Sequence, residues 1–571
     1  MNKISARQTI RRLHEIRNQY GPGPAAEKAG LLRSLQYLTV RTASDLRKLH
    51  LSLSFIRAFP DSKEIHESAS AMLADFHTLI PALSDSQQEK LADSGLAGTD
   101  DHYHFSYEVA AWLARRFQGV AAIDWDELHD TSRLDELLEH LLHHSEADYF
   151  DSGQVSTEEW VGIAAKHQPG TDFDWLMSQL DDRRHHSRFW TSLYNAAEIP
   201  LRCSLAESVI SRTRNVYPVS TVHYRKKNMQ SRVSKAKQEI AKPLRSLRLL
   251  DKRDGKRMID VAMSSLAVRH RETNHFNYAN PEEIWLADVG RGVSIAATGL
   301  LPEHRYPLET TMGFLILSNG APIGYGGSSM LFRQANNGIN IFEEYRGSEA
   351  AWLWVQVMRV FQAMSGGTRF IANPYQFGGD NLEALRSGAF WFYYRLGYRP
   401  VQPAIRALAR DEFVKIRKTK GYRTPLAVLK ELATCDMHLT LPGARQAEYF
   451  DESWIEICAL LATRQLALTG HRSRRRAQDE IARRLVEDLG IDSMEQWTQE
   501  ECKWFVRLGP IVAATRPATW SARDRQSMVK LMRAKGGDCE RDFVKRAFRH
   551  KQFFRALKDA CRLAARSLPC D

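Results

Sequence analysis

Apolar residues recur at spacings of three and four through the first 240 residues, which is the pattern of amphipathic helices. No stretch in this part alternates apolar and polar residues for long enough to predict a strand. We therefore expect a helical N-terminal domain over residues 1–240. One apolar stripe in it consists of Leu134, Leu137, Leu138, Leu141 and Leu142.

The pattern changes between residues 241 and 405, where short apolar runs alternate with helical segments. Residues 313–332 hold Asn319-Gly320 between two apolar runs. Both residues tolerate a positive φ, so this pair predicts a β-hairpin. The run INIF, residues 339–342, predicts a further strand that opens directly into a long amphipathic helix. These elements together indicate a domain of mixed strands and helices.

Helical periodicity returns after residue 405, and the last segment predicts a basic amphipathic helix or helix pair. A chain of 571 residues is too long for one ordinary core, so several domains are expected. The predicted fold class is α+β. A central mixed β-sheet with helices, residues 241–405, lies between helical domains at residues 1–240 and 406–571.

The formal net charge of +12 allows an anionic partner such as nucleic acid, an acidic substrate or a phosphorylated cofactor. Residues 222–257 are strongly basic. Their pattern is typical of a solvated helix that joins two domains, and a nucleic-acid contact is the alternative.

The seven cysteines are scattered and form no C-x-x-C pair, which is typical of a reducing compartment and argues against a disulfide framework or a zinc site. The N-terminus has no apolar core of signal-peptide length, and no run approaches a membrane span. We therefore expect a cytoplasmic protein without a membrane partner.

The strand at residues 339–342 leads through Tyr345, Arg346 and Gly347 into a helix. A helix N-terminus presents unpaired N–H groups and a partial positive charge, so it is a favourable place for a phosphate. Glycine lets the phosphate approach the backbone closely. Glu349 is the awkward residue of this turn, because its carboxylate would lie beside the bound anion.

Three features in order now resemble the GNAT superfamily of acyl-CoA-dependent N-acyltransferases. They are the hairpin whose second strand begins PIGYGG, the strand–Tyr-Arg-Gly–helix turn, and the downstream aromatic helix in FWFYYRLGYRP. The resemblance covers residues 244–400 and is similar to the family's Arg/Gln-x-x-Gly-x-Gly/Ala turn and its Tyr-x-x-Leu-Gly-Phe helix end. The helical flanks resemble no family that we can name.

The resemblance implies a fold, a donor substrate and a set of binding residues. Acetyl-CoA or another acyl-CoA would be the donor, and an amine of a small molecule or protein would be the acceptor. Glu349 stands where the family has glycine, so Glu349→Gly is expected to tighten CoA binding. The residues that would wrap the CoA pyrophosphate are Arg346, Gly347, Ser348, Glu349, Ala350 and Ala351.

The resemblance also implies catalytic roles. Tyr393 takes the place of the tyrosine that protonates the departing CoA thiolate. Ile341 or Phe342 would supply the N–H group that holds the tetrahedral oxyanion. Glu343 is the favoured general base. Glu309 and His304 are alternatives that the sequence does not rank.

Two other functions stay open. A GNAT-like scaffold could have lost CoA affinity through Glu349 and act as a binding protein. An aminoacyl-tRNA-dependent transferase would instead use the basic segments at residues 222–257 and 471–484 to contact nucleic acid. No metal is expected, since His140 and His144 have helical spacing but no fixed third ligand.

Overall fold

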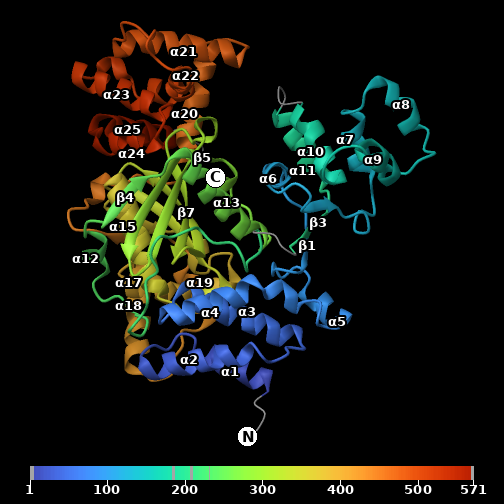
Figure 1. Ribbon diagram of the computed structural model, residues 1–571. Helices are drawn as coiled ribbons and strands as arrows, with labels where there is room; N and C mark the ends of the chain where they lie inside the picture. Colours follow the sequence, from blue (N-terminus) through green and yellow to red (C-terminus); the bar gives the residue numbers. More distant parts are fainter. Residues whose placement is uncertain (1–4, 183–186, 206–209, 231, 567–571) are drawn as a thin grey trace.

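A nine-stranded mixed sheet forms the centre of the computed structural model, which describes residues 5–182, 187–205, 210–230 and 232–566 (Figure 1). The strand order is β11-β12-β10-β9-β8-β7-β6-β5-β4. The α+β class expected from the sequence is confirmed. The strands are β4 (Ser246–Leu249), β5 (Ala279–Gly290), β6 (Val293–Leu300), β7 (Thr310–Ser318), β8 (Ala321–Leu331), β9 (Gln334–Ile341), β10 (Arg369–Ala372), β11 (Arg399–Pro400) and β12 (Met437–Thr440).

Neighbouring strands of this sheet are antiparallel except β9 and β10, which are parallel. The connection between them is α15 (Ala350–Ser365), because parallel strands need a crossover. Strand β12 follows the predicted domain boundary at residue 405 and still inserts between β10 and β11. The other helices of this unit are α12 (Ala236–Ile240), α13 (Lys252–Ala267), α14 (Asn274–Asn277), α16 (Leu382–Ser387), α17 (Ala389–Leu396), α18 (Pro403–Lys418) and α19 (Leu426–Leu432).

The predicted hairpin at Asn319-Gly320 is confirmed, since it joins β7 to β8 with φ of 47° and 82° at the two residues. A Cβ atom at Gly320 would lie 2.1 Å from the carbonyl oxygen of Tyr217. Asn319 Nδ2 donates to the carbonyl oxygen of Ala58 at 3.1 Å. The hairpin therefore ties this end of the sheet to the N-terminal helices.

The first helices form their own core beside that end of the sheet, at the blue end of the colour ramp in Figure 1. They are α1 (Ala6–Ile16), α2 (Pro22–Leu35), α3 (Ala43–Ala58), α4 (Lys63–Ala74) and α5 (Asp85–Gln88). The next helices form a lobe that stands to one side of the sheet (Figure 1). They are α6 (Tyr107–Arg116), α7 (Ser132–Glu139), α8 (His144–Asp151), α9 (Thr157–Ala165), α10 (Asp172–Asp182) and α11 (Ser187–Ala197).

Two expectations for the N-terminal part are wrong. Residues 1–240 are not wholly helical, because β1 (Asp100–Tyr103), β2 (Ala121–Ile123) and β3 (Leu201–Ser204) form a small antiparallel sheet. Strands of three or four residues are too short to show alternation. The basic residues 222–235 are not a helix either but an extended arm, and they enter a helix only at α12.

The C-terminal helices pack on the opposite end of the sheet, at the red end of the colour ramp. Their core includes Leu331 and Phe332 at the end of β8. The expected terminal helix pair is confirmed. Among the described residues, no helix is long and apolar enough to cross a membrane. These C-terminal helices are α20 (Trp454–Leu468), α21 (Arg474–Leu489), α22 (Gln499–Ala513), α23 (Ala522–Lys535), α24 (Glu540–Arg549) and α25 (Lys551–Arg566).

Candidate active site

The turn between β9 and α15 has one buried side and one open side. Tyr345 is buried and its ring lies 6.4 Å from that of Phe59 in the N-terminal helices. Arg346, Gly347 and Ala350 are exposed. Gly347 has a φ of 90°, a conformation that favours glycine. The open side therefore consists of a charged side chain, a bare backbone and the first residue of a helix.

Two of these residues have side chains that bear on an anion. The Arg346 guanidinium lies 3.8 Å from the exposed carboxylate of Glu383, a pair that solvent weakens. The Ser348 hydroxyl is buried and has no hydrogen-bond partner among the described residues. A bound oxyanion would supply an acceptor to the hydroxyl and a stronger partner to the guanidinium.

Glu349 turns away from the helix that it precedes. Its carboxylate accepts hydrogen bonds from Arg225 Nη2 at 2.7 Å and from Arg291 Nη1 at 2.8 Å. The backbone N–H of Gln230 donates to the same carboxylate at 2.8 Å. Glu349 is buried and makes no capping bond to its own helix.

These ion pairs change the charge that an anion would meet at the turn. Two guanidinium groups and one carboxylate leave an excess of one positive charge beside the N-terminus of α15. The helix adds its own partial positive charge. The like-charge objection raised by Glu349 is therefore answered, because the carboxylate is neutralised before any ligand arrives.

The parallel strands β9 and β10 separate close to the turn. Their pairing runs from Gln334–Arg369 to Asn336–Ile371, after which β10 ends while β9 continues to Ile341. The Phe342 N–H donates to the carbonyl oxygen of Ile323 at 3.0 Å, on the β8 side. Backbone groups alternate along a strand, so the Ile341 N–H faces the opened side. Of the two predicted oxyanion donors, Ile341 is the one whose N–H faces a ligand there.

Tyr393 reaches this opening through a short hydrogen-bond chain. Its hydroxyl donates to Gln376 Oε1 at 2.8 Å, and Gln376 Nε2 donates to the carbonyl oxygen of Asn337 at 2.7 Å. Asn337 lies on β9 just past the last paired residue. Tyr393 is buried, and burial raises its pKa. The phenol is consequently protonated at neutral pH and remains a hydrogen-bond donor.

The two glutamates that follow β9 have different surroundings. Glu344 is buried and accepts from Arg269 Nη2 at 2.7 Å, with Arg212 Nη1 at 3.8 Å. Burial raises the pKa of Glu344, but the two arginines outweigh burial and lower it to about 2. Glu344 is therefore too weak a base to take a proton, whereas Glu343 is solvent-exposed on a 3-10 turn.

Glu309 and His304 lie at the other end of the sheet. Thr310 pairs with Met330, and Met330 pairs with Ala335 near the start of β9. The turn follows the far end of β9, so roughly 20 Å of strand separates it from Glu309. Neither alternative base is therefore near the turn. His140 and His144 also fail to share one helix, since one follows α7 and the other begins α8.

Sequence reasoning missed three residues of this region: Arg225, Arg291 and Gln376. Arg225 and Arg291 lie 124 and 58 positions from Glu349. The one available signal was Glu349 itself, since a carboxylate in an anion site requires a basic partner. Gln376 gave no signal, because a glutamine in a glycine-rich loop has no characteristic spacing.

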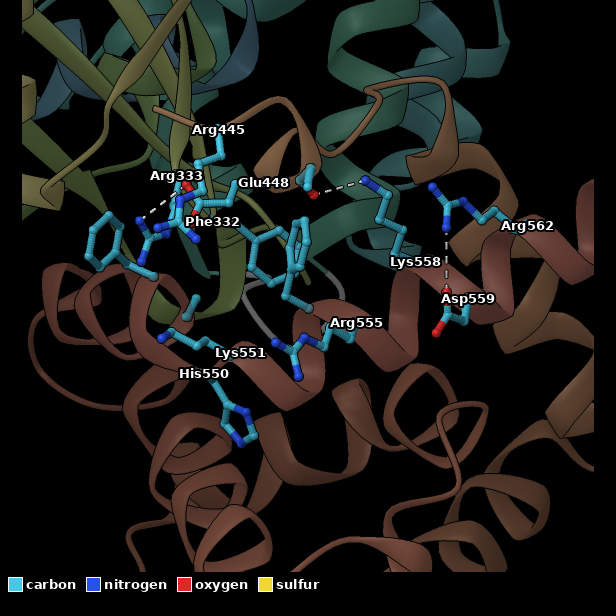
Figure 2. A pocket seen from close by; sticks show the side chains of 14 residues that line it. Phe332, Arg333, Arg445, Glu448, His550, Lys551, Arg555, Lys558, Asp559 and Arg562 are labelled. Atoms are coloured by element: carbon cyan, nitrogen blue, oxygen red, sulfur yellow. Dashed lines mark hydrogen bonds and ion pairs between the residues drawn. The ribbon is translucent and has the colours of Figure 1, made fainter. Parts of the chain in front are cut away.

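A second candidate site is a basic groove between the sheet and the C-terminal helices (Figure 2). Its volume is about 400 Å³. Lys551, Arg555, Lys558 and Arg562 come from one face of α25, since their spacings are four, three and four. We call it the α25 groove. Its lining side chains are Phe332, Arg333, Arg445, Ala447, Glu448, Ala547, Phe548, His550, Lys551, Phe554, Arg555, Lys558, Asp559 and Arg562.

Some of these cations have partners and others do not. Arg333 lies 3.3 Å from Glu448, and Lys558 Nζ donates to the carbonyl oxygens of Ala447 and Tyr449 at 3.1 and 3.0 Å. Within the described ranges, no hydrogen bond or ion pair engages the exposed side chains of the other cations. These are Arg445, Lys551 and Arg555.

The comparisons with known proteins add no relative. The chain matches no family model, no curated protein and no solved structure. The functional argument therefore depends on the turn, the strand opening and the α25 groove.

Proposed function

We propose that the central unit is a GNAT-type N-acyltransferase that uses acetyl-CoA or another acyl-CoA. The observation that carries this proposal is the opening of the only parallel strand pair described, with the N-terminus of α15 and the hydroxyl chain of Tyr393 beside it. Such an opening gives an extended ligand access to unpaired backbone groups of β9. The GNAT-like topology and the roles below belong to the proposal.

In this proposal the pyrophosphate of CoA lies on the open side of the turn. The backbone N–H groups of Ala350 and Ala351 face it, because the first N–H groups of a helix have no partner within the helix. Arg346 supplies charge, Gly347 permits close approach, and Ser348 supplies the unpartnered hydroxyl. Glu349 acts indirectly, by holding Arg225 and Arg291 in place.

The reaction would then transfer an acyl group from sulfur to nitrogen. The amine loses a proton, for which Glu343 is the candidate base, and its nitrogen attacks the thioester carbon. The Ile341 N–H stabilises the oxyanion that forms. The intermediate collapses, the carbon–sulfur bond breaks, and the Tyr393 hydroxyl protonates the departing thiolate.

Titration calorimetry with acetyl-CoA and with CoA tests the donor. Arg346→Ala should weaken CoA binding roughly 10- to 100-fold, the range expected when a charged hydrogen-bonding group is lost. Arg523→Ala, an exposed position on α23, is the matched control and should leave CoA binding unchanged. The absence of binding at millimolar ligand would reject the proposal.

Tyr393→Phe separates chemistry from binding. The ring keeps its packing against Trp354 and Phe377, so the variant should fold and bind CoA as before. Turnover should fall about 100-fold, because the proton donor is lost. A variant with unchanged turnover would remove Tyr393 from the mechanism.

A second function, contact with nucleic acid, is favoured by the α25 groove. Helices α24 and α25 carry nine Lys or Arg and three Asp or Glu, an excess equal to half of the formal net charge. Exposed cations beside Phe548 and Phe554 suit a phosphate backbone and its bases. A charged tRNA as acyl donor, which the sequence left open, would use this groove rather than Arg225, which is buried.

Salt dependence tests this second function. The affinity for a labelled single-stranded RNA or a tRNA should fall steeply between 50 and 200 mM salt, because bound phosphates release counterions. The double variant Lys551→Gln and Arg555→Gln should flatten that slope. A wild-type affinity that does not change with salt would exclude a nucleic-acid role for the α25 groove.

A further inference from the structure

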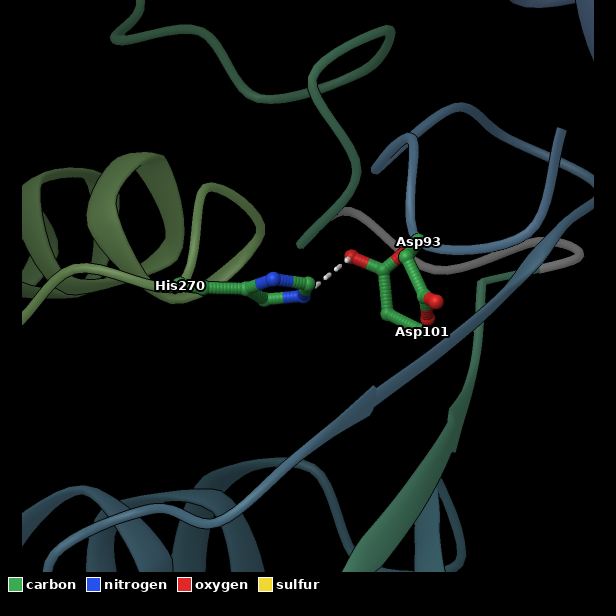
Figure 3. Close-up of side chains that lie close together, drawn as sticks. All are labelled: Asp93, Asp101 and His270. Carbon is green, nitrogen blue, oxygen red and sulfur yellow. Dashed lines mark ion pairs between the residues drawn. The ribbon is translucent and has the colours of Figure 1, made fainter.

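Three potential metal ligands meet where the side lobe joins α13 (Figure 3). Asp93 lies in the loop before β1, Asp101 lies on β1, and His270 follows the end of α13. One ligand atom from each residue lies within 4.8 Å of the other two. In Figure 3 the imidazole of His270 points at the two carboxylates across the gap between the segments.

The facing atoms of this cluster lack partners. His270 Nε2 and Asp101 Oδ2 are 3.9 Å apart, too far for a hydrogen bond. Both atoms are buried and have no hydrogen-bond partner within the described ranges, and only 3% of Asp101 is exposed. A buried carboxylate oxygen and a buried ring nitrogen without partners are costly to the fold. A cation between them would satisfy both.

Groups around the cluster hold the ligands in orientation. Asp101 Oδ1 accepts from the Gly95 N–H at 2.9 Å, which leaves Oδ2 as the unengaged oxygen. The Tyr103 ring stacks on His270 with ring centres 4.7 Å apart. Asp93 Oδ1 accepts from the His102 N–H at 2.7 Å. Contacts of this kind fix ligand orientation around protein-bound metals.

Arg212 is the nearest competing cation. Its charge acts on both Asp101 and His270. Its side chain is engaged elsewhere, however, because Nε donates to the Val268 carbonyl oxygen and Nη1 lies 3.8 Å from Glu344. Burial lowers the pKa of His270, which favours the neutral imidazole that can ligate a metal.

We propose that Asp93, Asp101 and His270 bind a divalent transition-metal cation, with zinc as the probe, which fastens the side lobe to α13. One nitrogen and two oxygen ligands suit zinc, whereas magnesium and calcium favour oxygen alone. Two carboxylates balance the charge of the ion. An inward movement of about 1 Å would bring the ligand atoms to zinc distances. This proposal departs from the sequence expectation of no metal.

The site has a route for the ion and for a water ligand. Asp93 also lines a cavity of about 460 Å³ together with His102, Asp124 and Arg202. A fourth, open position on the metal would face this cavity. The site is separate from the turn at residues 345–351, so its test does not depend on the acyltransferase proposal.

The test is calorimetry with zinc chloride on the full chain after dialysis against a chelator, with circular dichroism as a check of folding. One zinc ion should bind per chain with a dissociation constant below 10 µM, and zinc should raise the melting temperature. Asp101→Asn and His270→Gln should each weaken binding at least 10-fold, the scale of a lost ligand. Asp93→Asn is the variant least disruptive to the fold, because Asp93 is exposed.

His129→Gln is the matched control, since His129 is exposed and lies outside the cluster. It should bind zinc as the wild type does. No zinc binding by the wild type, or full binding by folded His270→Gln or Asp93→Asn, would overturn the proposal. The cluster would then be a hydrogen-bonding pair of a protonated Asp101 and His270.

Discussion

Glu349 shows how one residue can change meaning between a sequence and a structure. In the sequence it is a carboxylate placed where an anion should bind. In the fold it is a buried partner of Arg225 and Arg291, and it joins the extended arm to the start of α15. The residue therefore holds cations in place near the turn, which is the opposite of repelling a phosphate.

Replacement of Glu349 should consequently be read first as a stability change. Glu349→Gln leaves the buried Arg225 without its counter-charge, so the free energy of unfolding should fall by about 3 kcal/mol. Arg291→Gln should cost less, because 40% of the Arg291 side chain is exposed. Chemical denaturation of both single variants and the double variant measures the coupling. Additive losses would mean that the two side chains do not interact.

At the scale of elements, local chemistry was readable and long-range pairing was not. The Asn319-Gly320 hairpin and the helix after INIF were predicted because positive φ and amphipathic spacing are local properties. The separation of β9 from β10 was not predictable, because it depends on residues 30 or more positions apart. The same holds for the contact of Gln376 with β9, on which the position of Tyr393 depends.

The short turn after β9 also makes its stability depend on acid. The unfolded pKa of Glu344 is near 4.5, and the folded pKa is about 2. A lowered folded pKa means that the carboxylate stabilises the fold above pH 4.5 and loses that effect as the pH falls towards 2. The full contribution is on the order of 3 kcal/mol.

Glu344→Gln should therefore be less stable than the wild type at pH 7, since Arg269 and Arg212 lose their partner. The difference between the two proteins should shrink by about 2 kcal/mol at pH 3, where the wild-type carboxylate is becoming protonated. Urea unfolding at both pH values measures it. Glu343→Gln, the exposed neighbour, is the control. A difference that stays constant with pH would assign the loss to packing instead.

At the scale of the whole molecule, buried charges join the sheet to the C-terminal helices. Glu283 on β5, Arg305, Lys535 and Glu540 are all inaccessible to solvent. Arg305 donates to the carbonyl oxygens of Lys535 and Gly537 at 2.8 and 2.6 Å. Glu283 accepts the N–H of Arg541 at 3.0 Å. Two positive and two negative groups balance, so the C-terminal helices are fixed to the sheet at a defined position.

Arg305→Met tests whether this cluster fixes the C-terminal helices. The change leaves Glu283 and the carbonyl groups of the loop before α24 without a donor, so stability should fall by about 3–5 kcal/mol. Arg305→Lys should also be destabilising, because one ammonium group cannot replace a planar guanidinium. Limited proteolysis should cut the loop at residues 536–539 first. Arg410→Met, exposed on α18, is the control, and equal proteolysis of both variants would show that Arg305 holds no special position.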